Sequence, residues 1–225
     1  MKPTPRQEGK PAPPLEKKAE GERFTLPEGG LLMSDPHPLN QAIAERVSHR
    51  RYSDTPLELK ELAYLLHVTQ GVKKATSKAT FRNVPSAGAR HAFLTYLHVR
   101  NVVGLKPGIY RYHALDHELV LLNEGEKSGA SLKEACYGQT MFDQHAVSFI
   151  WVADVERMYH VYGERGYRYL FLDAGHVCQN LYLACETIDS GTVAVAAYDD
   201  DKLNSLLKLD GDDFFAIYVA PVGKL

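Results

Sequence analysis

The chain has 225 residues, of which 44% are hydrophobic, with a formal net charge of -2 and a pI of about 6.5. This length and apolar content are enough for one domain with a substantial core. The near-neutral charge excludes the broad electrostatic field of a nucleic-acid or membrane-surface protein. The longest mostly apolar run, at residues 146–153, is far shorter than the roughly 20 residues of a membrane-spanning helix.

Two features indicate the compartment. The N-terminal segment lacks the apolar stretch of a secretory signal. The three cysteines, Cys136, Cys178 and Cys185, form an odd and sparse set, which argues against a disulfide framework. We therefore expect a cytoplasmic protein whose cysteines pack as small core residues.

Proline is concentrated at the start of the chain, where residues 1–38 contain eight of the twelve prolines. Because proline fixes φ and lacks an N–H group, this segment is a poor helix or strand former. We predict an extended arm over residues 1–35, disordered at its start, and one globular domain over residues 36–225. The arm's apolar residues predict that its second half lies on the same chain or on a partner subunit; they are Phe24, Leu26, Leu31, Leu32 and Met33.

Helical patterns begin after the arm. Leu39, Ile43 and Val47 recur every four residues, which is typical of a helix face. A second helix is predicted from Thr55, with Pro56 in its first turn, Glu58 closing a capping box and Gly71 ending it. Further helices are predicted over residues 131–139, over 166–186 and after Asp199, and residues 72–83 are predicted to form a loop.

Strand patterns fall between these helices, over residues 92–100, 108–112, 118–122, 146–153, 192–197 and 214–220. The order shows no regular alternation of strand and helix, so it favours a layered α+β fold over a doubly wound one.

Several common site motifs are absent from the sequence. It contains no G-x-G-x-x-G, no P-loop, and none of H-E-x-x-H, C-x-x-C or G-x-S-x-G. His113 and His117 lie four residues apart in a predicted turn without an acidic or thiolate partner nearby. We therefore predict no metal site.

A basic segment, residues 46–52, could bind a phosphate. Arg46, Arg50 and Arg51 together with Ser48 could hold a dianion by charge-assisted hydrogen bonds. A solvated basic helix end would show the same pattern, so the spacing alone leaves both interpretations open.

Two further segments could face a flat ligand. Residues 85–89 are small and would let a ligand or a second chain approach closely. In residues 190–199 a strand of small residues runs into a capped helix, and its exposed N–H groups could face an aromatic ring edge. Both patterns are also common in loops and turns that bind no ligand. Lys224 adds a charge near the C-terminus but does not by itself indicate a binding site.

Seven stretches, in order, carry a family resemblance: RVSHRRYSD, VPSAGA, GLKPGIYRY, GQTM, YGERGYRYLFLDAGHVCQNLYLA, GTVAVAAYDDD and YVAPVGK. From about Leu39 to Lys224 the chain resembles the nitroreductase superfamily, and within it the SagB-type and thiazole/oxazole-forming dehydrogenase branch. The resemblance implies an α+β fold with an antiparallel sheet surrounded by helices, and a homodimer with two FMN sites at its interface.

The resemblance also implies roles. Arg46 and Lys224 would hold the FMN phosphate and Ser48 the phosphate or ribityl chain, while Arg50 would stabilise negative charge near flavin N1. Ala196 and Ala197 would present backbone N–H groups to N5, as the catalytic contact. The implied cofactor contacts are Arg46, Val47, Ser48, Arg50, Pro85, Ser86, Ala87, Gly88, Gln139, Ala194, Val195, Ala196, Ala197 and Lys224, with Ser86, Ala87 and Gly88 supplied by the partner subunit.

The chain departs from the branch at two places. After the small-residue loop it has Ala89-Arg90-His91-Ala92 where the branch often has Ala-Leu-Tyr-Pro. Before Gly-Glu-Arg it has Val161-Tyr162 where azoline-oxidising members resemble Lys-Tyr. Tyr162 stays a candidate catalytic residue, but the lysine that would help remove a proton is missing, which disfavours heterocycle oxidation.

Three functions follow as hypotheses. The first is an oxidoreductase that transfers hydride between NAD(P)H and a small electron-poor substrate, such as a nitroaromatic or a quinone, through FMN. The second is an FMN-dependent dehydrogenase of a peptide or metabolite, with Tyr162 near the flavin. The third is a non-enzymatic flavin-binding protein. None involves nucleic acid or a membrane.

Overall fold

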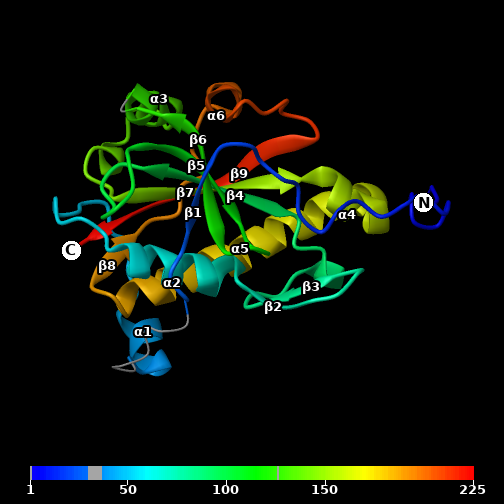
Figure 1. Ribbon diagram of the computed structural model, residues 1–225, viewed down its shortest axis with the longest axis horizontal. Coiled ribbons are helices and arrows are strands. Elements are labelled where there is room, and N and C mark those ends of the chain that lie inside the picture. Colours follow the sequence, from blue (N-terminus) through cyan, green and yellow to red (C-terminus); the bar gives the residue numbers. More distant parts are fainter. Residues whose placement is uncertain (1, 30–36, 126) are drawn as a thin grey trace.

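A single large sheet organises the molecule. The computed structural model describes residues 2–29, 37–125 and 127–225 (Figure 1). In this described part, seven strands form an antiparallel sheet in the order β1-β6-β5-β4-β7-β9-β8, and β2 pairs with β3 in a separate hairpin. The predictions for Leu31, Leu32 and Met33 fall outside the described residues.

The strands are β1 (Glu22–Thr25), β2 (Val72–Ala75), β3 (Thr80–Arg82), β4 (Phe93–Val99), β5 (Gly108–His113), β6 (Glu118–Glu124), β7 (Val147–Asp154), β8 (Ser190–Thr192) and β9 (Phe214–Lys224). The α-helices are α1 (Leu39–Glu45), α2 (Leu59–Gln70), α3 (Lys127–Ala135), α4 (Val155–Tyr162), α5 (Gly166–Glu186) and α6 (Asp200–Leu207), and short 3-10 turns are η1 (Ala87–Ala89), η2 (Thr140–Phe142) and η3 (Gly163–Arg165).

Helices cover both faces of the sheet. Figure 1 shows α3 and α6 on one face and α2 with α5 on the other. Alternate residues of β7 therefore enter two cores: Phe149 and Trp151 pack towards α2 and α5, and Ile150 and Val152 towards α3 and α6. The predicted α+β fold with an antiparallel sheet surrounded by helices is confirmed.

The start of α2 differs from the prediction. The helix begins at Leu59, and Glu58 is its N-cap in a capping box with Glu61, whose carboxylate accepts the Glu58 N–H at 3.0 Å. The expectation that Thr55 caps the helix is wrong. Leu57 is fully buried and forms a β-bridge with Val102, which holds the preceding residues in an extended conformation.

Three other segments differ from expectation. The predicted loop at residues 72–83 contains the β2–β3 hairpin, whose polar sequence reflects one exposed face and a buried contact from Arg82 to Gln70 at 2.7 Å. The strand predicted over residues 192–197 leaves the sheet after Thr192 and meets it again only at the bridge between Val195 and Val219. The helix predicted over residues 131–139 spans Lys127–Ala135 instead, and α4 had no sequence prediction.

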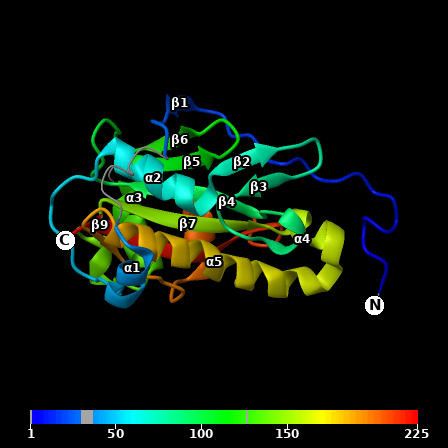
Figure 2. The same cartoon turned by 90° about the horizontal axis from the view of Figure 1, so that it is seen from below.

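The N-terminal segment follows the body of the molecule. Figures 1 and 2 show it running from beside α4 to β1, which pairs with β6 at the edge of the sheet. Disorder was expected at its start, but residues 2–10 include a turn anchored by the Arg6 N–H, which donates to the His160 carbonyl at 3.0 Å. Further along, Phe24 packs edge-on against Tyr110 and Leu26 is buried.

The three cysteines lie inside the molecule. Cys136, Cys178 and Cys185 are free and buried, as predicted for small core residues, and burial raises the pKa of Cys136 and Cys178 to about 12. Among the described residues, no helix combines the length and apolar character needed to cross a bilayer.

Candidate functional site

The basic segment after α1 lies along the short edge strand β8. The His49 N–H donates to the Thr192 carbonyl at 3.0 Å. At Gly191 a Cβ atom would lie 2.6 Å from the Cβ of His49, so only glycine permits this approach. The backbone around Ser48 is thereby fixed against the sheet.

Tyr182 on α5 brings three predicted residues together. The Ala194 N–H donates to its hydroxyl oxygen at 2.8 Å, which leaves the hydroxyl hydrogen free to donate to Ser48 Oγ at 3.0 Å. The Arg46 guanidinium lies 5.2 Å from the centre of the Tyr182 ring. No motif in the sequence points to Tyr182; its one signal is a hydroxyl on the mostly apolar buried face of a long helix.

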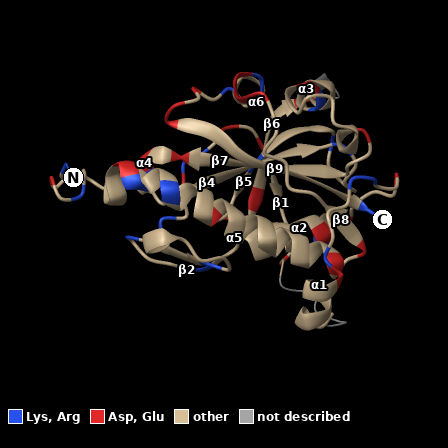
Figure 3. Ribbon diagram, turned by 180° about the vertical axis from the view of Figure 1, so that it is seen from behind, with Lys and Arg blue, Asp and Glu red and all other residues tan. Residues whose placement is uncertain are grey.

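Arginine charge is uncompensated here. No carboxylate of the described residues forms an ion pair with Arg46, Arg50 or Arg51. Arg46 is half-buried, and Arg50, which is exposed, donates to the Ser48 carbonyl at 3.4 Å. Figure 3 shows Lys and Arg in the loop beside the C-terminal end of the chain. This group of cations can receive an anion, because no internal partner has to be displaced.

Lys224 differs from these arginines. Its ammonium group lies 2.6 Å from Glu61 Oε1 and 2.6 Å from the Ile188 carbonyl oxygen. The lysine charge is therefore balanced within the chain, and its contact with a phosphate stays a prediction. Its backbone carbonyl accepts the Ser53 N–H at 2.8 Å, so Lys224 also anchors the loop after the basic segment.

Two of the four backbone N–H groups of residues 194–197 have no acceptor among the described residues. The Val195 N–H donates to Val219, but the N–H groups of the exposed residues Ala196 and Ala197 have no acceptor among the described residues. Gln139 Nε2 donates to the carbonyls of Ala197 at 3.0 Å and Cys136 at 2.9 Å. In the structure Gln139 therefore holds this segment in place through its amide nitrogen.

A second group forms around Asp173 of α5. Ser86 Oγ donates to Asp173 Oδ2 at 2.6 Å, and the Ala87 N–H points at the same carboxylate at 3.3 Å. Burial raises the pKa of Asp173, and these two hydrogen bonds oppose the rise. The loop of small residues is therefore tied to α5 by a buried acid that the sequence analysis did not identify.

Tyr162 belongs to this second group. Gly88 has a φ of +57°, and a Cβ there would lie 2.5 Å from the Tyr162 hydroxyl oxygen. The Tyr162 ring packs on Tyr169, with ring centres 4.6 Å apart. The structure thus places the candidate catalytic tyrosine directly against the loop of its own chain.

The two groups lie apart along one helix. Tyr182 and Asp173 are separated by nine residues of α5, which corresponds to roughly 13 Å at 1.5 Å per residue. Neither group by itself encloses a ligand, and Val47 and Pro85 lie exposed at their margins. The two groups are therefore separate on α5, and each includes residues exposed at the surface.

The sequence model of the nitroreductase family matches residues 43–224, which include both groups. The chain belongs to the nitroreductase family. The "Putative nitroreductase MJ1384" of Methanocaldococcus jannaschii is 36% identical over 186 residues, covering 83% of this chain and 90% of that protein.

Two further proteins are similar to the chain. The solved structure of a "putative nitroreductase" from Ralstonia eutropha JMP134 superimposes on the chain with a TM-score of 0.74. The two chains are 23% identical, and the match covers 95% of this chain and 98% of the other, which shows a shared fold. The trifolitoxin-processing protein TfxB of Rhizobium leguminosarum bv. trifolii is 29% identical over 60% of this chain, which spans only 38% of that protein. Such relatives agree with the SagB-like branch of the nitroreductase family.

An apolar strip on α1 and α5 is uncovered in this nitroreductase-family chain. The helix face predicted from Leu39, Ile43 and Val47 is exposed, and Ala42 is the buried residue of α1. Phe171 and Leu172 of α5 are 62% and 55% exposed. Figure 2 shows α1 beside α5 on the same side of the molecule. Exposed apolar side chains on two neighbouring helices are typical of an interface with another molecule.

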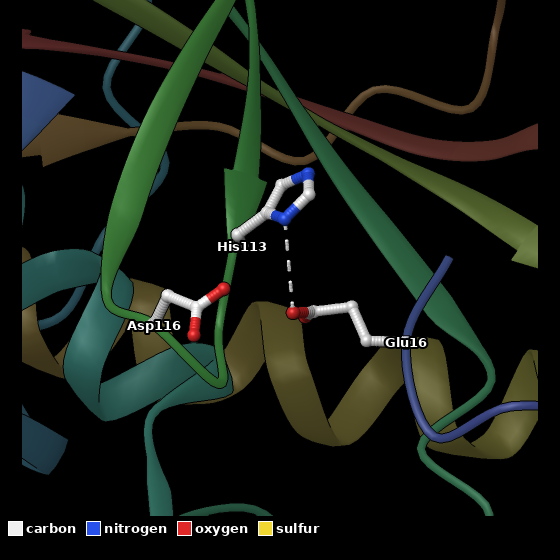
Figure 4. A group of neighbouring side chains, drawn as sticks. All are labelled: Glu16, His113 and Asp116. Carbon is white, nitrogen blue, oxygen red and sulfur yellow. Dashed lines mark ion pairs between the residues drawn. The ribbon is translucent and has the colours of Figure 1, made fainter. Parts of the chain in front are cut away.

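One cluster has the composition of a metal site. Glu16, His113 and Asp116 bring their ligand atoms within 4.8 Å of one another, so the expectation that His113 lacks an acidic partner is wrong (Figure 4). The Ala19 N–H donates to His113 Nε2 at 3.1 Å, so in the neutral ring Nδ1 carries the proton and faces Glu16. Glu16 also accepts from the Ala114 N–H at 2.8 Å. These contacts anchor the N-terminal arm to the turn between β5 and β6.

Proposed function

We propose that this nitroreductase-family chain is an FMN-dependent oxidoreductase that transfers hydride between NAD(P)H and a small electron-poor substrate. The observation that carries the proposal is a basic segment whose arginines, Arg46, Arg50 and Arg51, form no ion pair with the described residues. Tyr182 joins this segment to Ala194, which lies just before Ala196 and Ala197, whose N–H groups have no acceptor among the described residues. The arginines suit a phosphate, and the free N–H groups suit the edge of a polar ring. FMN carries both groups, one at each end of the molecule.

The chain's own groups would divide the work of binding. Arg46 and Ser48 would hold the phosphate, with Tyr182 fixing both, and Arg50 would set positive charge beside the ring. The N–H groups of Ala196 and Ala197 would orient the ring edge, with Gln139 holding their segment. FMN supplies the hydride chemistry at N5 when it is bound.

In this proposal the two groups are half-sites of one flavin site, and the second half-site belongs to another copy of the chain. Pro85, Ser86, Ala87 and Gly88 would cover the ring from the partner subunit, because the same chain holds them about 13 Å from Tyr182 along α5. The uncovered apolar strip on α1 and α5 supports a homodimer that unites the two half-sites. We expect two FMN sites per dimer, in the cytoplasm, with no nucleic acid or membrane partner.

A second function has a specific observation in its favour. Tyr162 Oη lies at the Gly88 loop, which in the dimer would bring it near the flavin of the partner. A tyrosine there could exchange a proton with a peptide or metabolite while that substrate is oxidised. The similarity to the trifolitoxin-processing protein TfxB supports this dehydrogenase alternative.

An absorption spectrum of the purified protein tests these proposals. A yellow protein that NAD(P)H bleaches rapidly without oxygen supports the reductase. Slow bleaching with retained FMN favours the dehydrogenase, and retained FMN that no donor reduces favours a non-enzymatic flavin-binding protein. A colourless protein with no affinity for added FMN would contradict all three.

A further inference from the structure

Part of the N-terminal arm lies across one end of the seven-stranded sheet. Because β5 and β7 both run antiparallel to β4, their C-terminal ends meet at the same edge, and α4 begins where β7 ends. Residues 11–20, here called the arm segment, contact this edge. The residues that hold them form the arm-binding surface, namely Arg111, His113, Ala114, Leu115, Asp154 and Arg157. None of these belongs to the two groups proposed for FMN.

Side chains of the body hold the main chain of the arm segment. Among the described residues, the segment forms no backbone-to-backbone hydrogen bond and belongs to no helix or strand. Instead, the Arg157 guanidinium donates to the Pro14 carbonyl, and Arg111 Nη2 donates to the Lys17 carbonyl at 3.1 Å. Main-chain groups occur in every peptide, so these two contacts provide affinity without regard to sequence.

Glu16 adds a contact that depends on sequence. Its carboxylate accepts from the Ala114 N–H at 2.8 Å and from the Leu115 N–H at 3.3 Å. Figure 4 shows this side chain reaching from the arm towards His113, whose Nδ1 lies 4.0 Å from Glu16 Oε2. Hydrogen bonds to an ionised acceptor are about twice as strong as those to a neutral one. This position therefore selects a carboxylate.

The next positions of the segment are also specified. Lys17 Nζ lies 3.8 Å from Asp154 Oδ1 and 3.5 Å from Glu156 Oε2, so a cation is favoured after the glutamate. The Ala19 N–H donates to His113 Nε2 at 3.1 Å, a contact that proline could not make. The surface thus fits an extended segment with glutamate followed by lysine, and with a residue other than proline two positions later.

The arm-binding surface needs an occupant. Arg111 and Arg157 are only 4% and 3% exposed, and neither forms an ion pair with a described carboxylate. Asp154 is fully buried, and Lys17 of the arm is its ion-pair partner. Polar groups that are buried without partners are costly, so this surface is built to stay covered by a peptide.

The arm itself is held lightly. No residue from 2 to 20 belongs to the buried core, so its departure exposes little apolar area. Pro11, Pro13 and Pro14 keep a free segment extended, so little conformational freedom is lost on binding. A separate peptide with the same pattern can therefore make the same contacts. The advantage of the arm is the high local concentration that its attachment gives.

We propose that the arm-binding surface is a docking site for an extended peptide segment of another protein, with glutamate followed by lysine, and that the arm occupies it as an internal competitor. The partner segment places its carboxylate on the N–H groups of Ala114 and Leu115 and its lysine beside Asp154. The arm also contacts α4, where the Arg6 N–H donates to the His160 carbonyl at 3.0 Å. Docking therefore also uncovers this part of α4.

Fluorescence anisotropy with a labelled synthetic peptide of residues 11–20, PAPPLEKKAE, tests the proposal on full-length chains. In Glu16→Ala the arm loses its carboxylate and competes less well, while the surface is unchanged. We expect this variant to bind the peptide at least about tenfold more tightly than the wild-type chain does. Glu8→Ala is the matched control and should behave as wild type, because Glu8 pairs with Lys10 within the arm. Equal affinities for Glu16→Ala and wild type, or no saturable binding to Glu16→Ala up to about 1 mM, would overturn the proposal.

Variant peptides test the individual contacts without changing the fold of the chain. A peptide with Glu16→Gln loses the charge on the N–H pair, and one with Ala19→Pro loses the donor to His113. Each should bind the Glu16→Ala chain at least about tenfold more weakly than the parent peptide. Lys18→Ala is the control, because Lys18 is exposed and forms no ion pair with the described residues, and it should bind like the parent. Equal affinities of all four peptides would contradict the proposed recognition.

Two further readouts identify the occupant. In the ¹⁵N-labelled wild-type chain, excess unlabelled peptide should move the Ala19 amide signal towards that of a disordered residue, because the arm leaves His113. Binding that leaves this signal unchanged would place the peptide elsewhere and overturn the proposal. Assemblies that grow with the concentration of the wild-type chain, but not of Glu16→Ala, would make the arm of a second copy the occupant and also overturn it. These measurements need no flavin, so their outcome is separate from that of the proposed oxidoreductase activity.

Discussion

The Arg46 guanidinium lies 5.2 Å from the centre of the Tyr182 ring, and the hydroxyl of the same tyrosine lies 3.0 Å from Ser48 Oγ. One side chain of α5 thus fixes both a cation and a hydroxyl of the basic segment. A cation held over a ring loses less freedom when it binds an anion, which strengthens the interaction.

Replacing Arg46 should weaken FMN binding. For Arg46→Ala we expect the dissociation constant for FMN to rise about 10- to 100-fold, the effect of losing a charge-assisted hydrogen bond. Fluorescence titration of the FMN-free protein measures it. Lys224→Met is the control: because Lys224 pairs with Glu61, it should lower the melting temperature with a smaller effect on FMN. Equal weakening in both variants would show that Lys224 also reaches the phosphate.

The two half-sites should complement each other between subunits. Asp173→Ala frees the Ser86 loop, and Arg46→Ala disables the basic segment, so each variant alone should bind FMN poorly. If the proteins are mixed and allowed to exchange subunits, half of the dimers pair the two variants, and each of these regains one intact site. We expect about a quarter of the wild-type FMN binding to return. If FMN binding does not return although subunit exchange is verified, the Arg46 group and the Asp173 group serve the same site within one subunit.

The apolar strip should hold the dimer together. Phe171→Glu places a charge on this surface, and we expect a shift to monomer at micromolar concentration with loss of FMN. Analytical ultracentrifugation measures the shift. Val103→Glu is a matched control, because Val103 is also exposed but lies in the loop between β4 and β5 rather than on α1 or α5. A dimeric Phe171→Glu protein would exclude this surface as the main interface.

A buried carboxylate depends on the N-terminal arm. Asp154 is fully buried, neither oxygen has a hydrogen-bond partner among the described residues, and Lys17 Nζ lies 3.8 Å away. Burial raises the pKa of Asp154, and the Lys17 charge opposes the rise. We expect Lys17→Met to lower the free energy of unfolding by about 2 kcal/mol, because it removes the cation that forms an ion pair with this buried carboxylate.

Urea denaturation of the double variant checks the cause. With Asp154→Asn added, the charge is gone, and most of the lost stability should return. If the two effects simply add, Lys17 acts through its contact with the Phe214 ring instead.

Acid should destabilise the fold through buried histidines. Burial lowers the pKa of His91 to about 3, with a smaller contribution from Arg82, and those of His98 and His145 are lowered to about 4 and about 3. The unfolded residues have a pKa of about 6.5, so below that pH the unfolded chain binds protons that the folded chain does not. The free energy of unfolding should therefore fall as pH decreases from about 6.5 towards 4, by about 1.4 kcal/mol per pH unit for each such histidine.

Urea denaturation at several pH values measures this slope. His91→Gln should make it shallower by the contribution of one proton. An unchanged slope would show that His91 takes up its proton without unfolding the chain.

The sequence predicted the elements whose signals are local. α5 has the predicted bounds, and Asp199 caps α6 as expected, because apolar periodicity and a side-chain cap are read within one segment. The start of α2 was misplaced because the long-range bridge from Leu57 to Val102 outweighs the cap signal at Thr55. The β2–β3 hairpin was missed because most of its side chains face solvent.

The residues of the candidate site also divide into those with a local sequence signal and those whose role depends on long-range contacts. Arg46, Ser48 and Ala194 were predicted from two separate motifs, and the structure brings them together on Tyr182. Tyr182 and Asp173 could not be selected from the sequence, since their roles depend on which loops reach the buried face of α5. The ion pair of Lys224 with Glu61 likewise joins residues 163 positions apart, beyond any local pattern.

The pairing of β1 with β6 has a further consequence for the behaviour of the protein in solution. An edge strand with free backbone groups is a template on which other molecules can add their own strands and aggregate. Residues Glu22–Thr25 fill that position along β6, while at the far edge only the three residues of β8 are presented. The proline-rich arm therefore also protects solubility, and a chain shortened past β1 should precipitate at concentrations that the whole chain tolerates.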